Sequence, residues 1–225
     1  MSGEKMVSLS DFTLEDGKYL VSLARRTVET YLKTGVKIVP PQNLDSKYYE
    51  KLGVFVTIER IGYTGTGMFK ELRGCIGYPY PIKPLVEALI DSAVSAAVED
   101  PRFPPMKFKE LDNVVFEVSV LSKPEELKVK NRAELPKLIV IGRDGLIVEY
   151  GWFKGLLLPQ VPVEYKWDVE TFLAETCMKA GLPPDSWLLS DVKVYRFEAA
   201  IFCEKTPKGE IVKRDLFEEL KKCHG

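Results

Sequence analysis

Two side chains that could carry out chemistry lie two residues apart in the segment Leu72-Arg73-Gly74-Cys75-Ile76-Gly77. Alternate side chains share a face of an extended chain, so the spacing predicts Arg73 and Cys75 on one face and Leu72 and Ile76 in a core. A neighbouring guanidinium lowers the pKa of a cysteine and favours the nucleophilic thiolate. The glycines allow close approach by a ligand or by another segment of the chain. The alternative is that Cys75 is a small buried hydrophobe and Arg73 an ordinary ion-pair partner.

The only histidine, His224, is the penultimate residue, and this excludes the common histidine-dependent sites. Ser-His-Asp and Cys-His triads, H-E-x-x-H zinc sites and two-histidine facial triads all need a histidine elsewhere in the chain. Proton transfer would have to use Cys, Asp, Glu, Lys or Tyr. The cysteines at 75, 177, 203 and 223 form no C-x-x-C pair, so we expect free thiols, no metal site and no cofactor.

Composition is that of an ordinary globular protein, with 225 residues, 45% hydrophobic and 29% charged. The chain has 32 basic and 33 acidic residues, so no overall field draws it to nucleic acid or to a membrane. The N-terminus lacks an apolar leader, and no apolar stretch is long enough to span a bilayer. We therefore expect a cytoplasmic protein. Sparse Asn and Gln beside plentiful Glu and Lys hint at a thermophilic source.

Periodicity and capping residues predict helices that alternate irregularly with strands. The predicted helices span 13–34, 84–97 and 168–180, with a short one at 215–222, and the predicted strands span 52–58, 72–77, 114–121 and 193–203. The first two strands form an antiparallel hairpin around Tyr63–Gly67, which we interpret as a turn and not as a phosphate loop. A second hairpin joins 138–141 to 146–148 through an Asp144-Gly145 turn. Mostly hairpin connections predict an α+β fold with antiparallel sheets flanked by helices.

Further polar residues of interest lie in loops and on the strand at 114–121. Asp100, Arg102 and Phe103 belong to a loop that three prolines stiffen, where Asp100 and Arg102 either pair with each other or take part in catalysis. Glu117 and Ser119 share one strand face, which faces water or lines a cleft. Gln160 ends an extended run as a binding residue or a loop hydrogen-bonder.

Five segments together resemble the AMMECR family, named for the Alport syndrome, midface hypoplasia and elliptocytosis chromosomal region protein. They are Leu72–Gly77, Asp100–Pro104, Glu117–Ser122, Gly155–Val161 and Lys179–Pro183. The resemblance implies one domain over 1–225, with a family-like core of about 7–205 and a larger and a smaller lobe around a cleft. It implies no established reaction. Some microbial relatives occur with a Memo-type protein and a radical-SAM enzyme, which would be pathway partners.

Three hypotheses follow. In the first, the protein is an enzyme or enzyme component in a modification pathway, with Cys75 as nucleophile or group carrier, Arg73 holding an anionic group, and Glu117 and Asp100 as acid–base candidates. In the second, it is a non-catalytic binding or adaptor protein for a small molecule, nucleotide, RNA or peptide. The third is structural, with an Arg73–Glu117 ion pair that holds two lobes together. The candidate binding residues are Arg73, Gly74, Gly77, Asp100, Arg102, Phe103, Ser119 and Gln160.

Overall fold

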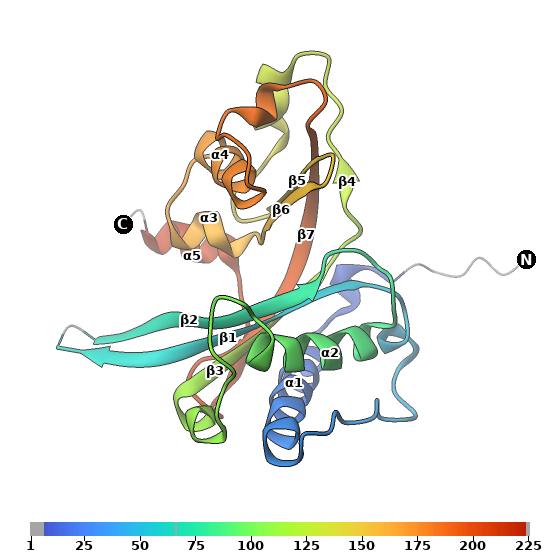
Figure 1. Cartoon of the computed structure of the whole chain (residues 1–225), viewed down its shortest axis with the longest axis vertical. Helices are drawn as coiled ribbons and strands as arrows, with labels where there is room; N and C mark the ends of the chain where they lie inside the picture. The colour runs from blue at the N-terminus through green and yellow to red at the C-terminus, as the bar shows by residue number, and fades with distance from the viewer. Residues whose placement is uncertain (1–6, 66, 224–225) are drawn as a thin grey trace, which may run out of the picture. The chain divides into compact units, whose positions relative to one another are not determined.

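The first long helix, α1 (Leu14–Thr34), begins and ends where the sequence predicts (Figure 1). In the computed structural model of the chain, which describes residues 7–65 and 67–223, Thr13 caps α1 in a reciprocal capping box with Asp16. Gly35 ends the helix in the left-handed conformation, with φ of 73°. These local signals explain why the prediction for this helix is confirmed.

The chain divides into two units, Met1–Leu121 with Ala200–Arg214, and Ser122–Ala199 with Asp215–Gly225. Unit 1 contains α1, strands β1 (Gly53–Thr64), β2 (Gly67–Tyr78), β3 (Val114–Leu121) and β8 (Ile211–Lys213), helix α2 (Leu85–Val98), and 3-10 helices η1 (Leu9–Asp11), η2 (Ser46–Tyr48) and η3 (Phe108–Asn113). Unit 2 contains β4 (Glu125–Glu126), η4 (Arg132–Leu138), β5 (Asp144–Tyr150), β6 (Phe153–Leu157), α3 (Gln160–Glu164), α4 (Val169–Lys179), η5 (Ser186–Leu188) and α5 (Leu216–Cys223). Strand β7 (Lys193–Glu204) runs from unit 2 into unit 1.

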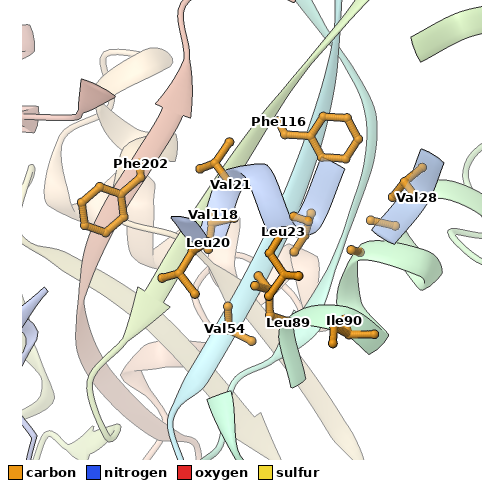
Figure 2. Packing of buried hydrophobic residues seen from close by; sticks show 14 of the residues in the cluster. Leu20, Val21, Leu23, Val28, Val54, Leu89, Ile90, Phe116, Val118 and Phe202 are labelled. Atoms are coloured by element: carbon orange, nitrogen blue, oxygen red, sulfur yellow. The ribbon is translucent and has the colours of Figure 1, made fainter. Parts of the chain in front are cut away.

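The sheet of unit 1 has the strand order β2-β1-β3, and both strand pairs are antiparallel. One face of this sheet packs against α1 and α2. Figure 2 shows Leu20, Leu23 and Val28 of α1 grouped with Val54 of β1 and Phe116 of β3. Burial of these apolar side chains is the main source of stability in unit 1. The predicted hairpin of the first two strands is confirmed, and beyond Arg60, the last β1 residue paired with β3, it continues as a two-stranded ribbon (Figure 1).

A β-bulge interrupts the pairing of β1 with β2 at the residue of greatest interest. Ile58 pairs with Gly74 and the next residue, Glu59, pairs with Leu72, so Arg73 is the extra residue of β2. A bulge shifts the alternation of side chains along the strand by one position. The segment predicted as a regular strand therefore has two registers, one on each side of Arg73.

In unit 2, β5 pairs antiparallel with both β6 and β7, and α4 packs beside β6. The predicted hairpin between 138–141 and 146–148 is wrong. Asp144 instead accepts a hydrogen bond from the main-chain N–H of Val140 at 2.7 Å and opens β5 opposite Glu198 of β7. Its carboxylate ties the preceding turn together, so the Asp-Gly pair starts a strand and does not connect two.

The resulting fold is the predicted α+β class, with antiparallel strand pairs and interspersed helices. Helix α4 begins after the predicted cap, Asp168, and Cys177 on its apolar face is fully buried. Across the described residues, none of the helices has the length and apolar character needed to cross a membrane. The predicted cleft between two lobes stays a prediction.

Candidate functional site

The bulge separates Arg73 from Cys75, the two side chains that the sequence predicts on one strand face. Cys75 pairs with Thr57, and Thr57 also pairs with Glu117, so these three residues form one row across β2, β1 and β3. This row lies on the face opposite Val56 and Ile58, which pack toward the helices. Arg73 stands at the extra position and its guanidinium bonds elsewhere, to Glu110 of η3. The predicted pairing of Arg73 and Cys75 on one regular strand face is therefore wrong, because a bulge breaks the alternation on which it rests.

Cys75 is half-buried and its main chain is held at both polar atoms. The N–H of Cys75 donates to Asp100 at 2.9 Å, and Nη2 of Arg102 donates to the Cys75 carbonyl at 3.3 Å. The Thr57 hydroxyl donates to Sγ at 3.3 Å. Burial of the thiol raises the pKa of Cys75 to about 11, against the lowering effects of the Thr57 hydrogen bond and the Arg102 charge. The expectation of a thiolate stabilised by Arg73 is not supported by these contacts.

Alkylation of the native protein should therefore be slow at Cys75 at neutral pH. With a pKa of about 11, roughly one thiol in 10⁴ is ionised at pH 7. Iodoacetamide labelling followed by peptide mass spectrometry should show a Cys75 rate that increases about tenfold per pH unit up to pH 9. Rapid labelling below pH 7 would instead mean a low-pKa thiolate and would favour the enzyme hypothesis over the binding hypothesis.

Arg73 is 5% exposed and forms a two-pronged ion pair with Glu110. Nε donates to Glu110 at 2.9 Å and Nη2 at 3.3 Å, and Nη2 also donates to the carbonyl of Pro104 at 2.9 Å. Burial opposes ionisation of Glu110, but the hydrogen bonds from Arg73, the Lys107 N–H and Arg60, with the charge of Arg73, together outweigh it and lower the pKa of Glu110 to about 2. The pair is fully charged at neutral pH and fixes the guanidinium plane.

A pocket of about 360 Å³ opens beside this ion pair, wholly within unit 1. Its polar wall carries three cationic side chains and two carboxylates, and its apolar wall consists of one leucine, one phenylalanine and two prolines. The lining residues are Arg60, Glu71, Leu72, Arg73, Phe103, Pro104, Pro105, Lys107 and Glu110. The pocket combines a slight excess of positive charge with a rigid apolar side, which suits a ligand with an anionic group.

Asp100 and Arg102 pair with each other, which is one of the two roles that the sequence predicts for them. Nη2 of Arg102 donates to Asp100 at 2.7 Å and Nε at 2.9 Å. Phe103 lies near two guanidinium groups, with its ring centroid 5.8 Å from Cζ of Arg73 and 5.5 Å from Cζ of Arg102. The Asp100–Phe103 loop thus holds the main chain of Cys75 on one side and lines the Arg73 pocket on the other.

Glu117 and Ser119 are both buried, at 3% and 0% exposure. Nη1 of Arg214 donates to Glu117 at 2.8 Å. The structural hypothesis of an Arg73–Glu117 ion pair is therefore wrong in its partners, because Arg73 pairs with Glu110 and Glu117 with Arg214. Ser119 pairs with Phe55 in the row next to Cys75 and Glu117.

The two motif glycines make room for the chain itself. A Cβ atom on Gly74 would overlap the carbonyl oxygen of Ala96 in α2, and one on Gly77 would overlap the carbonyl oxygen of Val54 in β1. Of the two roles that the sequence leaves open, approach by another segment therefore accounts for both glycines. Neither glycine lines the pocket.

The remaining candidate, Gln160, is the first residue of α3 in unit 2 and is 4% exposed. It ends no extended run, because β6 stops at Leu157. Sequence reasoning missed Thr57, Arg60, Lys107 and Glu110. Their roles depend on strand register and on the fold of η3, and no local motif marks them.

Asp100, Glu110 and Asp16 should lose their stabilising effect in acid. For Asp100, burial opposes ionisation but hydrogen bonds from Arg102 and the Cys75 N–H outweigh it and lower its pKa from 3.8 to about 2. A depressed folded-state pKa gives stability that is complete above the unfolded pKa and is lost as pH falls through the folded one. The free energy of unfolding, measured with urea, should fall between pH 4 and 2. In Asp100→Asn this fall should be smaller, by at most about 1–2 kcal/mol. An unchanged pH dependence in Asp100→Asn would contradict the assigned contacts.

The fold and the site together define an α+β protein with a charged pocket at a β-bulge of its larger unit. Within the described residues, no group of three or more His, Cys, Asp or Glu side chains is placed to hold a metal ion. The AMMECR1 family model matches residues 21–202. The chain belongs to the AMMECR1 family.

Several archaeal proteins are similar to this chain over almost their whole length. A Pyrococcus abyssi protein is 55% identical over 202 residues, which cover 90% of this chain and 97% of the relative. A Methanocaldococcus jannaschii protein is 54% identical over 204 residues, covering 91% of this chain and 98% of the relative. The crystal structure of an uncharacterized protein from Pyrococcus horikoshii matches with a TM-score of 0.83 and 56% identity, over 88% of this chain and 96% of that one.

Proposed function

We propose that this protein is a non-catalytic binding protein whose Arg73 pocket holds an anionic group of its ligand. The observation that carries the proposal is the buried Arg73 guanidinium, which Glu110 and the Pro104 carbonyl hold in place at the wall of a 360 Å³ pocket. A fixed guanidinium loses little conformational freedom on binding, so it favours recognition of carboxylate or phosphate. Arg60 and Lys107 add cationic side chains at the same wall.

Arg60 is the more adaptable partner in this arrangement. Its side chain is 50% exposed and Nη2 donates to Glu110 at 3.2 Å, a single long contact. A ligand anion can draw the Arg60 guanidinium toward itself, because Arg73 continues to neutralise Glu110. Phe103, Leu72 and the two prolines offer an apolar surface to the rest of the ligand.

The enzyme hypothesis has weaker support. Its nucleophile, Cys75, has a pKa of about 11, and Arg102, which donates to the Cys75 carbonyl, is engaged with Asp100. Glu117 is neutralised by Arg214. A half-buried, neutral thiol flanked by paired charges is typical of packing and not of nucleophilic catalysis.

Binding of three anionic probes tests the proposal. Adenosine monophosphate, a short single-stranded RNA and an acidic heptapeptide should be titrated into the protein by isothermal titration calorimetry. At least one should bind, and an Arg60→Ala/Lys107→Ala variant should weaken that binding about tenfold or more. A steep loss with salt would assign the ligand as nucleic acid.

The matched control is Lys221→Ala/Lys222→Ala, which removes two charges from exposed side chains of α5, outside the pocket. This variant should bind as the wild type does. The proposal fails if no probe binds at about 1 mM, or if the two double variants lose affinity equally.

A further inference from the structure

Strand β2 lies at an outer edge of its sheet. β2 stands at the end of the strand order, and within residues 7–65 and 67–223 its only strand partner is β1. An edge strand carries a row of main-chain N–H and C=O groups that point away from the sheet. Another extended chain can pair with such a row.

The pairing of β2 with β1 identifies the β2 residues whose main-chain N–H and C=O groups point away from β1. In antiparallel pairs, hydrogen-bonded and non-hydrogen-bonded residues alternate along each strand. The main-chain N–H and C=O of Cys75 point outward, because they bond to Asp100 and Arg102 and not to β1. The bulge at Arg73 shifts the alternation by one residue, so the outward set continues at Leu72, Lys70 and Met68.

The chain closes this edge on one side of the bulge only. Asp100 and Arg102 occupy the main chain of Cys75. No residue of the described chain hydrogen-bonds to the main chains of Met68, Lys70 or Leu72. This open stretch, Met68–Leu72, is about 17 Å long, at roughly 3.3 Å per residue.

The usual protections of an edge strand are weak over this stretch. No proline interrupts Gly67–Leu72, and the charge of Lys70 is neutralised by Glu59 at 2.9 Å. Apolar side chains are exposed along it, with Met68 and Phe69 each at 46% and Leu72 at 38%. The open edge also ends at the Arg73 pocket, because Glu71, Leu72 and Arg73 line that pocket.

We propose that the open edge of β2 binds an extended peptide as an added strand, with an acidic side chain of the peptide in the Arg73 pocket. This inference rests on the proposed binding function and names its ligand class. Main-chain hydrogen bonds to Met68, Lys70 and Leu72 would supply affinity. The charge of Arg60, Arg73 and Lys107 would select the acidic side chain.

A second copy of this chain is a poorer occupant of the same edge. Two β2 strands that pair antiparallel about a two-fold axis at the middle of the open stretch would place Lys70 opposite Lys70 of the other copy. Each Lys70 is paired with its own Glu59, but two like charges brought directly opposite each other still destabilise a strand pair. A peptide with an acidic residue has no such conflict.

The test is selection of a displayed random heptapeptide library on the full-length protein, followed by fluorescence polarisation of the selected peptides. They should be enriched in β-branched residues and should carry an acidic residue whose replacement by its amide weakens binding about tenfold. Lys70→Pro removes one outward N–H but no bond to β1, and should also weaken binding about tenfold. Lys70→Ala keeps that N–H and should bind as the wild type does.

Peptide N-methylation provides a second measurement that does not depend on the folding of Lys70→Pro. Methylation of one alternate set of peptide nitrogens should abolish binding, and methylation of the other set should leave it within about twofold. The inference is overturned if the library yields no binder, or if both methylated sets bind alike. If adenosine monophosphate or RNA binds in a manner sensitive to Arg60→Ala/Lys107→Ala while no peptide binds, the proposed function stands and only the peptide inference fails.

Discussion

A Gly74→Ala variant will unfold at a temperature about 10 °C below that of the wild type, equivalent to about 3–4 kcal/mol of lost stability. The added Cβ would overlap the carbonyl oxygen of Ala96, a main-chain atom inside α2. A main-chain atom cannot rotate away as a side chain can, so α2 must move from the sheet and leave part of its apolar face unpacked. Thermal unfolding followed by circular dichroism measures the effect.

Gly65→Ala is the matched control, because no heavy atom of the described residues, apart from Gly65 and its chain neighbours, lies within 4 Å of the position its Cβ would take. Its stability should stay within about 0.5 kcal/mol of the wild type. If Gly74→Ala instead retained its stability and lost only ligand binding, the glycine would serve ligand approach and not the packing of α2.

A Glu204→Ala variant will lose about 3–5 kcal/mol of stability, because it leaves the buried charge of Arg25 without its partner. Nε of Arg25 donates to Glu204 at 2.6 Å, and Glu204 also accepts from the N–H of Phe116 at 3.0 Å. Arg25 further donates to the carbonyl of Leu111 in η3 and to that of Val114, the first residue of β3. Because η3 carries Glu110, this variant should also weaken binding in the Arg73 pocket.

Two comparisons make the Glu204 result interpretable. The double variant Arg25→Met/Glu204→Leu removes both charges and should recover most of the lost stability. Glu210→Gln breaks an exposed ion pair with Lys205 and should change stability by less than about 0.5 kcal/mol. Equal losses in Glu204→Ala and Glu210→Gln, measured by urea unfolding, would contradict the buried network.

Local signals predicted the elements whose ends are set by neighbouring residues. The Thr13 cap and Gly35 bound α1, and Asp168 begins α4, because these contacts lie within a few residues of each helix end. The regular strand predicted at 72–77 failed at Arg73. A bulge depends on the register of the partner strand, and that register is set by residues far away in sequence.

The candidate site was predicted only in part, because some of its contacts also depend on residues far apart in sequence. The sequence pointed to Arg73, Asp100 and Phe103, which the structure brings together around one loop. It assigned the wrong partner to Arg73, because Glu110 reaches it only through the fold of η3. The low pKa expected for Cys75 failed because burial, which sequence does not measure, outweighs a nearby positive charge.

The central claim is that ligand binding depends on the Arg73 pocket and not on the thiol of Cys75. Calorimetric titration of the tightest-binding probe into Cys75→Ala and Arg60→Ala/Lys107→Ala tests it most directly. We predict that Cys75→Ala binds within about twofold of the wild type, while the double variant loses about tenfold or more. Loss of binding in Cys75→Ala with full affinity in the double variant would contradict the account and place the functional site at the cysteine.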